Sequence, residues 1–269
     1  MVSKVSKRIL ILVLAFALGC LLIGCASTTG KLKSIQESGE MVVYTDANFS
    51  PFEFQAPGGG VMGVDIEIAK AIAQRLGVTA KFEDAKFDSI LMAIKGGKGD
   101  IAISGFTITE ERRESVDFSV PYIESVQYLI LPSDSGIRIM EDLAGKRVAV
   151  AFGYTGEFLM DDETGEEGVL FGTGTEVTAY NSASEATMAL NSGKVDAVVM
   201  DEYVAKNIVS NNSSLQAIAL SYQSGDLASE EYGVAVPKGN EDLLAIINEV
   251  IASLKSEGKI QEWVVSFSA

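Results

Sequence analysis

"SILMAIKGGKGDIAI", residues 89–103, returns 96 residues later as "EATMALNSGKVDAVV", residues 185–199. Apolar residues at helical spacing lead into a turn with the pattern Gly-Lys-x-Asp, and an apolar strand follows it. The aligned identities are Met92/Met188, Ala93/Ala189, Gly97/Gly193, Lys98/Lys194 and Asp100/Asp196. A repeated supersecondary unit of this kind predicts two similar α/β lobes, each with a sheet of its own.

The segments around the repeat alternate in the same way. "MVVYT" (41–45) reads as a strand, and a helical pattern then runs from Asp65, a predicted N-cap, to a glycine stop at Gly77. "KRVAVAFGYTGEFLM" (146–160) reads as a strand, a glycine turn and a helix. This alternation predicts mostly parallel sheets flanked by helices.

The N-terminus has the composition of an export signal. Three basic residues precede an uncharged apolar stretch at residues 9–23, which is shorter than the roughly 20 residues needed to span a bilayer. Leu22-Ile23-Gly24-Cys25 resembles the lipobox of bacterial lipoproteins, and Cys20 is a weaker second candidate. We therefore expect a signal peptide at residues 1–24, diacylglycerol on Cys25, and a flexible tether at 25–38 that holds the protein on the outer face of the cell membrane.

Residue types that the chain lacks exclude many mechanisms. It has no histidine, and both cysteines lie in the leader, so Ser-His-Asp and Cys-His catalysis and the usual zinc sites are excluded. No metal and no cofactor are predicted. The net charge of −16 makes nucleic acid a poor partner.

Candidate ligand contacts follow the ends of the predicted strands, where open α/β sheets bind small molecules. In "SGFTITEERR" (104–113), the backbone of Ser104, Gly105 and Thr107 can approach a ligand, and Thr109 can cap the helix that Arg112 enters. A guanidinium can grip a carboxylate with two parallel hydrogen bonds. The alternative, a solvated first helical turn, suits Glu110, Glu111 and Arg113.

The second half of the chain offers a matching set. Asp201 directly follows the apolar run "AVVM", where an unpaired carboxylate is costly unless a cation meets it. Thr155, in "GYTGE", stands at a strand-to-helix turn that can bind an anion. We expect Phe49 and Phe87 to be exposed on loops and to sandwich an aliphatic chain, with core packing as the alternative for each.

Several motifs together resemble the extracellular solute-binding proteins of polar amino-acid ABC transporters. These are "VVYTDANFSPFEF", "GVDIEIAKAIAQRLG", "SGFTITEERRESVDFSVPYIES", "VAVAFGYTGE", "VDAVVMDEY" and "YGVAVPKG". The resemblance implies a type II periplasmic-binding-protein fold, with residues 39–126 and 231–269 in lobe 1 and 127–230 in lobe 2. Two strands would cross between the lobes near Ser125–Leu131 and Glu230–Val236.

The resemblance also assigns roles. Arg112 would bind the ligand α-carboxylate and Asp201 its α-ammonium, while Asp46 would face the ligand side chain. The other contacts would be the loop residue Ser104, the hydrogen-bonding Gly105, Thr107 and Thr155, and the stacking rings of Phe49 and Phe87. Because Asp46 and Asp201 outnumber Arg112, the pocket favours a basic side chain over a glutamine-like one.

The sequence thus predicts a monomeric lipoprotein that captures a polar L-amino acid and delivers it to the permease of an ABC importer, without catalysis. Two alternatives stay open: an exported enzyme of the same fold, such as a cyclohexadienyl dehydratase, and a sensory binding lipoprotein.

Overall fold

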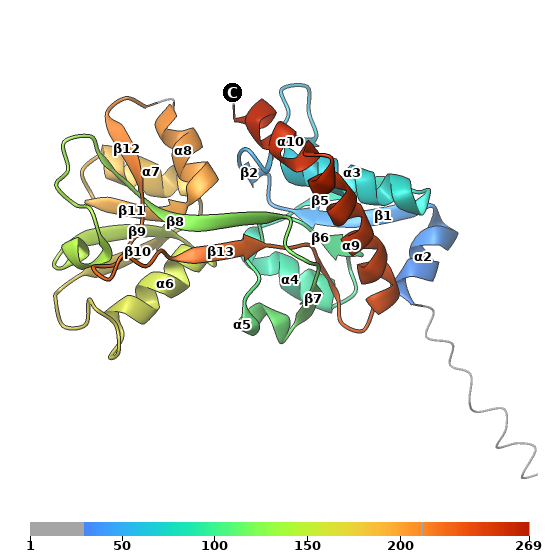
Figure 1. Cartoon of the computed structure of the whole chain (residues 1–269), viewed down its shortest axis with the longest axis horizontal. Coiled ribbons are helices and arrows are strands. Elements are labelled where there is room, and N and C mark those ends of the chain that lie inside the picture. The colour runs from blue at the N-terminus through green and yellow to red at the C-terminus, as the bar shows by residue number, and fades with distance from the viewer. Residues whose placement is uncertain (1–29, 211, 269) are drawn as a thin grey trace, which may run out of the picture.

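The computed structural model describes residues 30–210 and 212–268. Strands gather in two main sheets, and helices flank each sheet to form two lobes (Figure 1). The predicted two-lobed α/β fold is confirmed. The predicted signal peptide and Cys25 lie outside the described residues.

The first sheet has the strand order β5-β1-β6-β14-β7. Its strands are β1 (Glu40–Thr45), β5 (Thr79–Asp84), β6 (Ile101–Ala102), β7 (Val116–Phe118) and β14 (Ala235–Pro237). β1 is parallel to β5 and β6, whereas β14 runs antiparallel to β6 and β7. A late strand thus returns into the sheet that the N-terminal part of the chain began. The helices of this lobe are α2 (Lys31–Ser38), α3 (Val64–Leu76), α4 (Phe87–Lys95), α5 (Glu110–Arg113), α9 (Glu241–Ser256) and α10 (Lys259–Phe267).

The second sheet has the order β10-β9-β11-β8-β12. Its strands are β8 (Ile123–Pro132), β9 (Arg147–Ala151), β10 (Glu176–Tyr180), β11 (Ala197–Asp201) and β12 (Leu215–Ala219). β9 is parallel to β10 and β11, and β8 is antiparallel to β11 and β12. The helices here are α6 (Thr155–Thr164), α7 (Ala183–Asn191), α8 (Glu202–Ser210) and the short 3₁₀ helix η1 (Met140–Leu143). The two sheets share one plan: three parallel strands followed by an antiparallel one.

Two antiparallel strands join the lobes. β13 (Ser229–Tyr232) pairs with the first residues of β8, from Ser229 opposite Val126 to Tyr232 opposite Ile123. Figure 1 shows β8 and β13 running side by side from one lobe into the other. In the described residues, the chain passes from one lobe to the other through this two-stranded ribbon. We therefore expect the lobes to move about it as a hinge.

The repeat is visible in three dimensions. In α4, Ile90 and Ile94 are fully buried, and the corresponding face of α7 buries Ala186 and Leu190. Both aligned methionines point to solvent: Met92 is 62% exposed and Met188 63% exposed. Equivalent positions therefore face the same way in the two lobes, and the prediction that each copy is a helix, a turn and a strand is confirmed.

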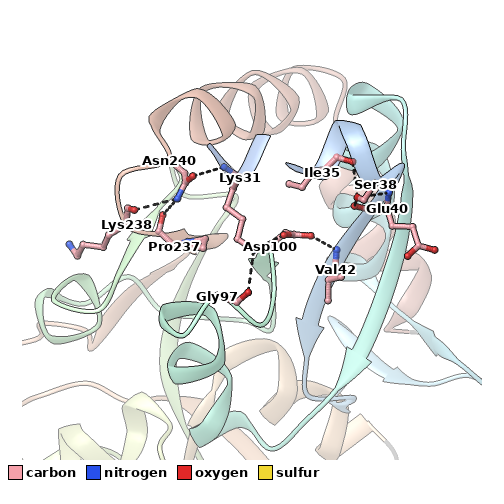
Figure 2. Close-up of polar contacts among 10 residues, drawn as sticks. All are labelled: Lys31, Ile35, Ser38, Glu40, Val42, Gly97, Asp100, Pro237, Lys238 and Asn240. Atoms are coloured by element: carbon pink, nitrogen blue, oxygen red, sulfur yellow. Dashed lines mark hydrogen bonds and ion pairs between the residues drawn. The ribbon is translucent and has the colours of Figure 1, made fainter. Parts of the chain in front are cut away.

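A small three-stranded sheet and the N-terminal helix complete the first lobe. The small sheet consists of β2 (Asn48–Phe49), β3 (Glu53–Gln55) and β4 (Val61–Met62). Helix α2 is fixed at its start, because Lys31 Nζ lies 2.8 Å from Asp100 Oδ1 and the Lys31 backbone N–H donates to Asn240 Oδ1 (Figure 2). The flexible tether predicted at 25–38 is therefore wrong for residues 31–38, which form this helix, and residues 25–29 lie outside the described residues. No helix in the described part of the chain is long and apolar enough to cross a bilayer.

Candidate functional site

A small cavity lies between the two lobes, where strand ends of both sheets approach each other. The space between its lining atoms is about 180 Å³, including the part that is open to solvent. The residues that line it are Phe49, Phe87, Gly105, Thr107, Arg112, Tyr154, Thr155 and Asp201. All of these except Tyr154 were predicted as ligand contacts, so sequence positions that are more than 150 residues apart meet at one place.

Arg112 forms one wall of the cavity. Thr109 caps helix α5, as predicted, by accepting a hydrogen bond from the Arg112 backbone N–H. The guanidinium donates from Nη1 to the carbonyl oxygen of Thr107 at 2.9 Å and from Nη2 to that of Gly153, in the other lobe, at 3.1 Å. Two of its five N–H groups are thereby used, and the remaining ones are available to a ligand anion.

The environment of Arg112 is apolar and anionic. Its guanidinium carbon lies 5.4 Å from the centre of the Phe87 ring and 5.6 Å from that of Phe106. Burial lowers the pKa of Arg112 from its usual value, and the negative charges of Asp201 and Glu230 oppose this effect. A ligand carboxylate would add a direct partner to a buried cation that here contacts only neutral groups.

Asp201 ends β11 on the opposite side of the cavity and is only 3% exposed. Its Oδ1 accepts a hydrogen bond from Gln127 Nε2 at 2.9 Å, and its Oδ2 accepts one from the Tyr232 hydroxyl at 2.6 Å. Each carboxylate oxygen has a second lone pair. Asp201 can therefore accept hydrogen bonds from a ligand ammonium while its neighbours hold it in place.

Thr107 and Thr155 approach each other across the boundary between the lobes. Their hydroxyl oxygens lie 3.4 Å apart, and both are within hydrogen-bonding distance of Glu230 Oε2. Glu230 is a polar residue that the sequence analysis missed, although it starts the predicted second crossing and directly precedes the apolar run "YGVAV". An acidic residue so close to an apolar run is unusual, and this is the feature of the sequence that could have identified Glu230.

The loop after β6 contributes two predicted residues in different ways. Gly105 has a φ of +56°, and a Cβ atom there would lie 2.4 Å from the Phe49 ring, so this cavity residue must be glycine. Ser104 does not line the cavity. Its hydroxyl accepts a hydrogen bond from the Asp46 backbone N–H and donates one to Glu53 Oε1 at 2.7 Å. Ser104 thus fixes the loop from behind.

Behind this loop lies a buried pair of carboxyl groups. Asp65 is not the N-cap of α3, because the helix begins at Val64 and Gly63 takes the capping position. Asp65 instead accepts hydrogen bonds from the Gly105 backbone N–H at 2.7 Å and the Tyr122 hydroxyl at 2.9 Å. Burial raises the pKa of Asp65 to about 6, and burial followed by the charge of Asp65 raises the pKa of Glu53 well above its usual value. The pair therefore retains a proton near neutral pH, which lets two acids share a dry site.

The aromatic residues differ from the prediction. Phe49 belongs to β2 and is only 3% exposed, and Phe87 is the first residue of α4 and half-buried; neither is an exposed loop residue. Tyr154, which the sequence analysis missed, lies between them, with ring centres 5.5 Å from Phe49 and 4.5 Å from Phe87. Phe49 and Phe87 line the cavity from lobe 1, and the Tyr154 ring lines it from lobe 2.

Asp46 lies outside the small cavity but lines a larger one beside it, with an empty volume of about 950 Å³. Its Oδ1 accepts from Asn48 Nδ2 and its Oδ2 from the Phe87 backbone N–H. Burial raises the pKa of Asp46, and Asp84 and Asp88 add repulsion. The residues that line this acidic cavity are Asp46, Asn48, Asp84, Ala85, Lys86, Phe87, Asp88, Phe152 and Asn181. Phe87 lines both cavities, so they adjoin at this residue.

Known proteins resemble this chain over nearly all of the described residues. L-cystine-binding protein TcyJ of Escherichia coli (strain K12) is 32% identical over 235 residues, which cover 86% of this chain and 84% of TcyJ. The arginine-binding extracellular protein ArtP of Bacillus subtilis (strain 168) is 30% identical, with 95% of this chain and 96% of ArtP covered. An amino acid ABC transporter substrate-binding protein, AbpA of Streptococcus pneumoniae, solved with L-arginine, superposes with a TM-score of 0.79 at 32% identity and covers 88% of this chain and 97% of its own.

The family model agrees with these pairwise similarities. The model for bacterial extracellular solute-binding proteins, family 3, matches residues 41–267, which include both lobes and the cavity between them. The resemblance seen in the sequence motifs is thereby confirmed. This chain belongs to the bacterial extracellular solute-binding proteins, family 3.

Proposed function

We propose that the protein is an extracellular receptor that binds a basic L-amino acid between its lobes and delivers it to the permease of an ABC importer. The observation that carries the proposal is the position of Arg112 and Asp201 on the walls of one cavity. A guanidinium and a carboxylate so placed are complementary to the α-carboxylate and α-ammonium of one amino acid. Because Arg112 comes from lobe 1 and Asp201 from lobe 2, a ligand that contacts both favours the closed form.

The acidic cavity beside this site supports a cationic side chain. Asp46, Asp84 and Asp88 lie along it with a single lysine, Lys86. A guanidinium or ammonium would lower the electrostatic cost of these neighbouring carboxylates, whereas a neutral amide would not. Relatives named for binding arginine, in Bacillus subtilis and Escherichia coli, point to the same class.

The geometry favours binding over catalysis. The dehydratase alternative needs an acid above the leaving group of its substrate. Burial, and then Asp201, raise the pKa of Glu230 to about 8, which makes it the best candidate for such an acid. However, Glu230 does not line the cavity, and its carboxyl is held by Thr107 and Thr155. It is placed to support those residues and not to contact a leaving group.

Calorimetric titration of residues 30–269 against amino acids tests the proposal. We expect L-arginine, L-lysine or L-histidine to bind with a Kd below about 100 μM, which corresponds to roughly −5.5 kcal/mol, and more tightly than L-glutamine. L-Cystine serves as the competitor whose distal half carries both an ammonium and a carboxylate and therefore no net charge. Tighter binding of glutamine or cystine would refute the basic class while keeping the receptor role, and no binding of any amino acid would refute both.

We also propose that Cys25 carries a lipid that holds the receptor at the outer face of the cell membrane. The support is the lipobox-like Leu22-Ile23-Gly24-Cys25 after the apolar leader. Cys25→Ser should release the protein from the membrane fraction of the expressing bacterium, whereas Cys20→Ser should leave it bound. The reverse result would move the anchor to Cys20, and membrane binding of both single variants would exclude a single anchoring cysteine.

A further inference from the structure

Glu230 occupies the point where the two lobes and the connecting strands meet. It lies in β13, opposite Ser125 of β8, and is only 8% exposed. Its Oε2 is 2.9 Å from Thr107 Oγ1, in the loop of lobe 1 that leads to Arg112. The same oxygen is 2.8 Å from Thr155 Oγ1, at the first turn of α6 in lobe 2. One carboxyl oxygen therefore bridges side chains of both lobes.

The hydrogen atoms can be counted. A threonine hydroxyl has one hydrogen and two lone pairs. Both hydroxyls donate to Oε2 of Glu230, so the proton of this carboxyl group belongs on Oε1. Neither hydroxyl then has a hydrogen left for a ligand in the cavity, and each can only accept. One lone pair of Thr155 already accepts from Gln127 Nε2, at 3.3 Å.

The other oxygen of Glu230 is held by the same network. Gln127 Nε2 lies 3.1 Å from Glu230 Oε1 and 2.9 Å from Asp201 Oδ1, so one amide group orients both acids. The Tyr232 hydroxyl completes the arrangement at Asp201. Gln127 of β8 thus fixes Glu230 through its second oxygen, Oε1.

The residues that line the cavity thus include both donors and acceptors. Arg112 supplies N–H donors, and Asp201, Thr107 and Thr155 supply acceptors. An ammonium group has three N–H donors and no acceptor, so three acceptors match it. Only Asp201 among them carries a charge; the two hydroxyls become acceptors through their bonds to Glu230.

We propose that Glu230 is a positioning residue for the ligand ammonium. It accepts hydrogen bonds from the hydroxyls of Thr107 and Thr155, so that the two threonine oxygens are left as acceptors for the cavity. It also links the two lobes when they close. The inference rests on the proposed amino-acid-binding function. It goes further by assigning a role to a residue that does not touch the ligand.

The experiment compares Glu230→Gln and Glu230→Ala with Glu231→Gln, a matched control on the same strand whose side chain is exposed. Each variant is titrated with L-arginine and with an arginine analogue that lacks the α-ammonium. We expect L-arginine to bind roughly ten- to a hundredfold more weakly to Glu230→Ala, whereas Glu230→Gln, whose amide oxygen can accept in place of Oε2, should bind it nearly as well as the wild type. The analogue, which keeps only the carboxylate contact with Arg112, should bind with the affinity that it has for the wild type. A merely structural role for Glu230 would weaken both ligands equally.

The outcomes separate the two proposals. If the wild type binds no amino acid, the proposed function fails and the inference fails with it. If the wild type binds L-arginine and Glu230→Ala binds it equally well, or loses the analogue to the same extent, only the inference fails. Should Glu230→Ala not fold, Glu230→Leu, which keeps much of the side-chain bulk and has no acceptor oxygen, decides the matter. An unchanged affinity in Glu231→Gln is required for the expected result to count.

Discussion

Asp100 and Asp196 make the same pair of hydrogen bonds in the two lobes. The backbone N–H of Asp100 donates to the Val42 carbonyl at 2.9 Å, and its Oδ2 accepts from the Val42 N–H at 2.8 Å. Asp196 does the same with Arg147, at 2.7 and 2.9 Å. Each also pairs with a cation: Asp100 with Lys31, as Figure 2 shows, and Asp196 with the Arg147 side chain. The aspartate of the Gly-Lys-x-Asp turn thus binds the neighbouring parallel strand of its own sheet, β1 in one lobe and β9 in the other.

The two sets of hydrogen bonds should differ in strength, because their surroundings differ. The Asp100 side chain is 12% exposed and that of Asp196 is 36% exposed. We expect Asp100→Ala to lower the free energy of unfolding by about 1–3 kcal/mol, since the Val42 N–H loses its partner where little water reaches it. Asp196→Ala should cost less than about 1 kcal/mol, because water can replace an exposed pair. Urea denaturation measures both, and a larger loss at Asp196 would contradict this reasoning.

Arg112 and its neighbour Arg113 provide a second matched pair. Arg112 lines the cavity, while the Arg113 side chain is 44% exposed and pairs only loosely with Glu110, at 3.8 Å. We expect Arg112→Ala to abolish amino-acid binding, a loss of about a hundredfold or more, because the ligand carboxylate would lose its charged partner. Arg113→Ala should bind like the wild type. Titration calorimetry measures both affinities, and retained binding in Arg112→Ala would disprove the carboxylate assignment.

A substitution of Asp46 tests whether the ligand has a basic side chain. Asp46→Asn removes one negative charge from the acidic cavity and keeps the size of the side chain and one of its two acceptor oxygens. A basic amino acid should therefore lose roughly tenfold in affinity, while glutamine should be little affected. The ratio of the two dissociation constants is the quantity to measure. The basic-ligand proposal would be refuted by an unchanged ratio.

Much of the fold and site could be predicted because the evidence was local in the sequence. Gly77 ends α3 with a φ of +74°, Ser182 caps α7 by accepting from the Glu185 N–H, and Thr109 caps α5, as their residue types indicate. Arg112 and Asp201 then lie at one cavity. This follows the general rule that open α/β sheets bind ligands at the carboxyl ends of their strands.

The errors arose where side chains meet across elements far apart in the chain. Asp65 looks like an N-cap from its position before a helical pattern, but its partners are Gly105 and Tyr122, which no local pattern indicates. Tyr154 and Glu230 matter only because closure of the lobes brings them against residues of the other lobe or of the hinge. Long-range polar contacts of this kind depend on the tertiary structure and not on local sequence propensity.

Buried acids predict an unusual dependence of stability on pH. Burial raises the pKa of Glu230 from 4.5 to about 8 and that of Asp65 from 3.8 to about 6, and it raises the pKa of Glu53 as well. Between the ordinary and the raised values, the folded chain holds protons that the unfolded chain has released. The contribution of these groups to the free energy of unfolding is therefore largest at a pH near their ordinary pKa values. It falls as the pH rises towards the raised pKa values, by up to about 1.4 kcal/mol per pH unit for each such proton.

The ligand-free protein should accordingly melt at a higher temperature at pH 5.5 than at pH 8.5. Its net charge of −16 acts in the same direction, so the total slope alone does not identify the buried acids. Glu230→Gln removes one of them, and we expect a shallower decline of Tm between pH 5.5 and 8.5 in that variant. Glu231→Gln removes the same formal charge from an exposed position and should keep the wild-type slope. Equal slopes in the two variants would show that Glu230 is ionised in the folded protein across this range, since a group that does not bind its proton differently on folding contributes nothing to the pH dependence.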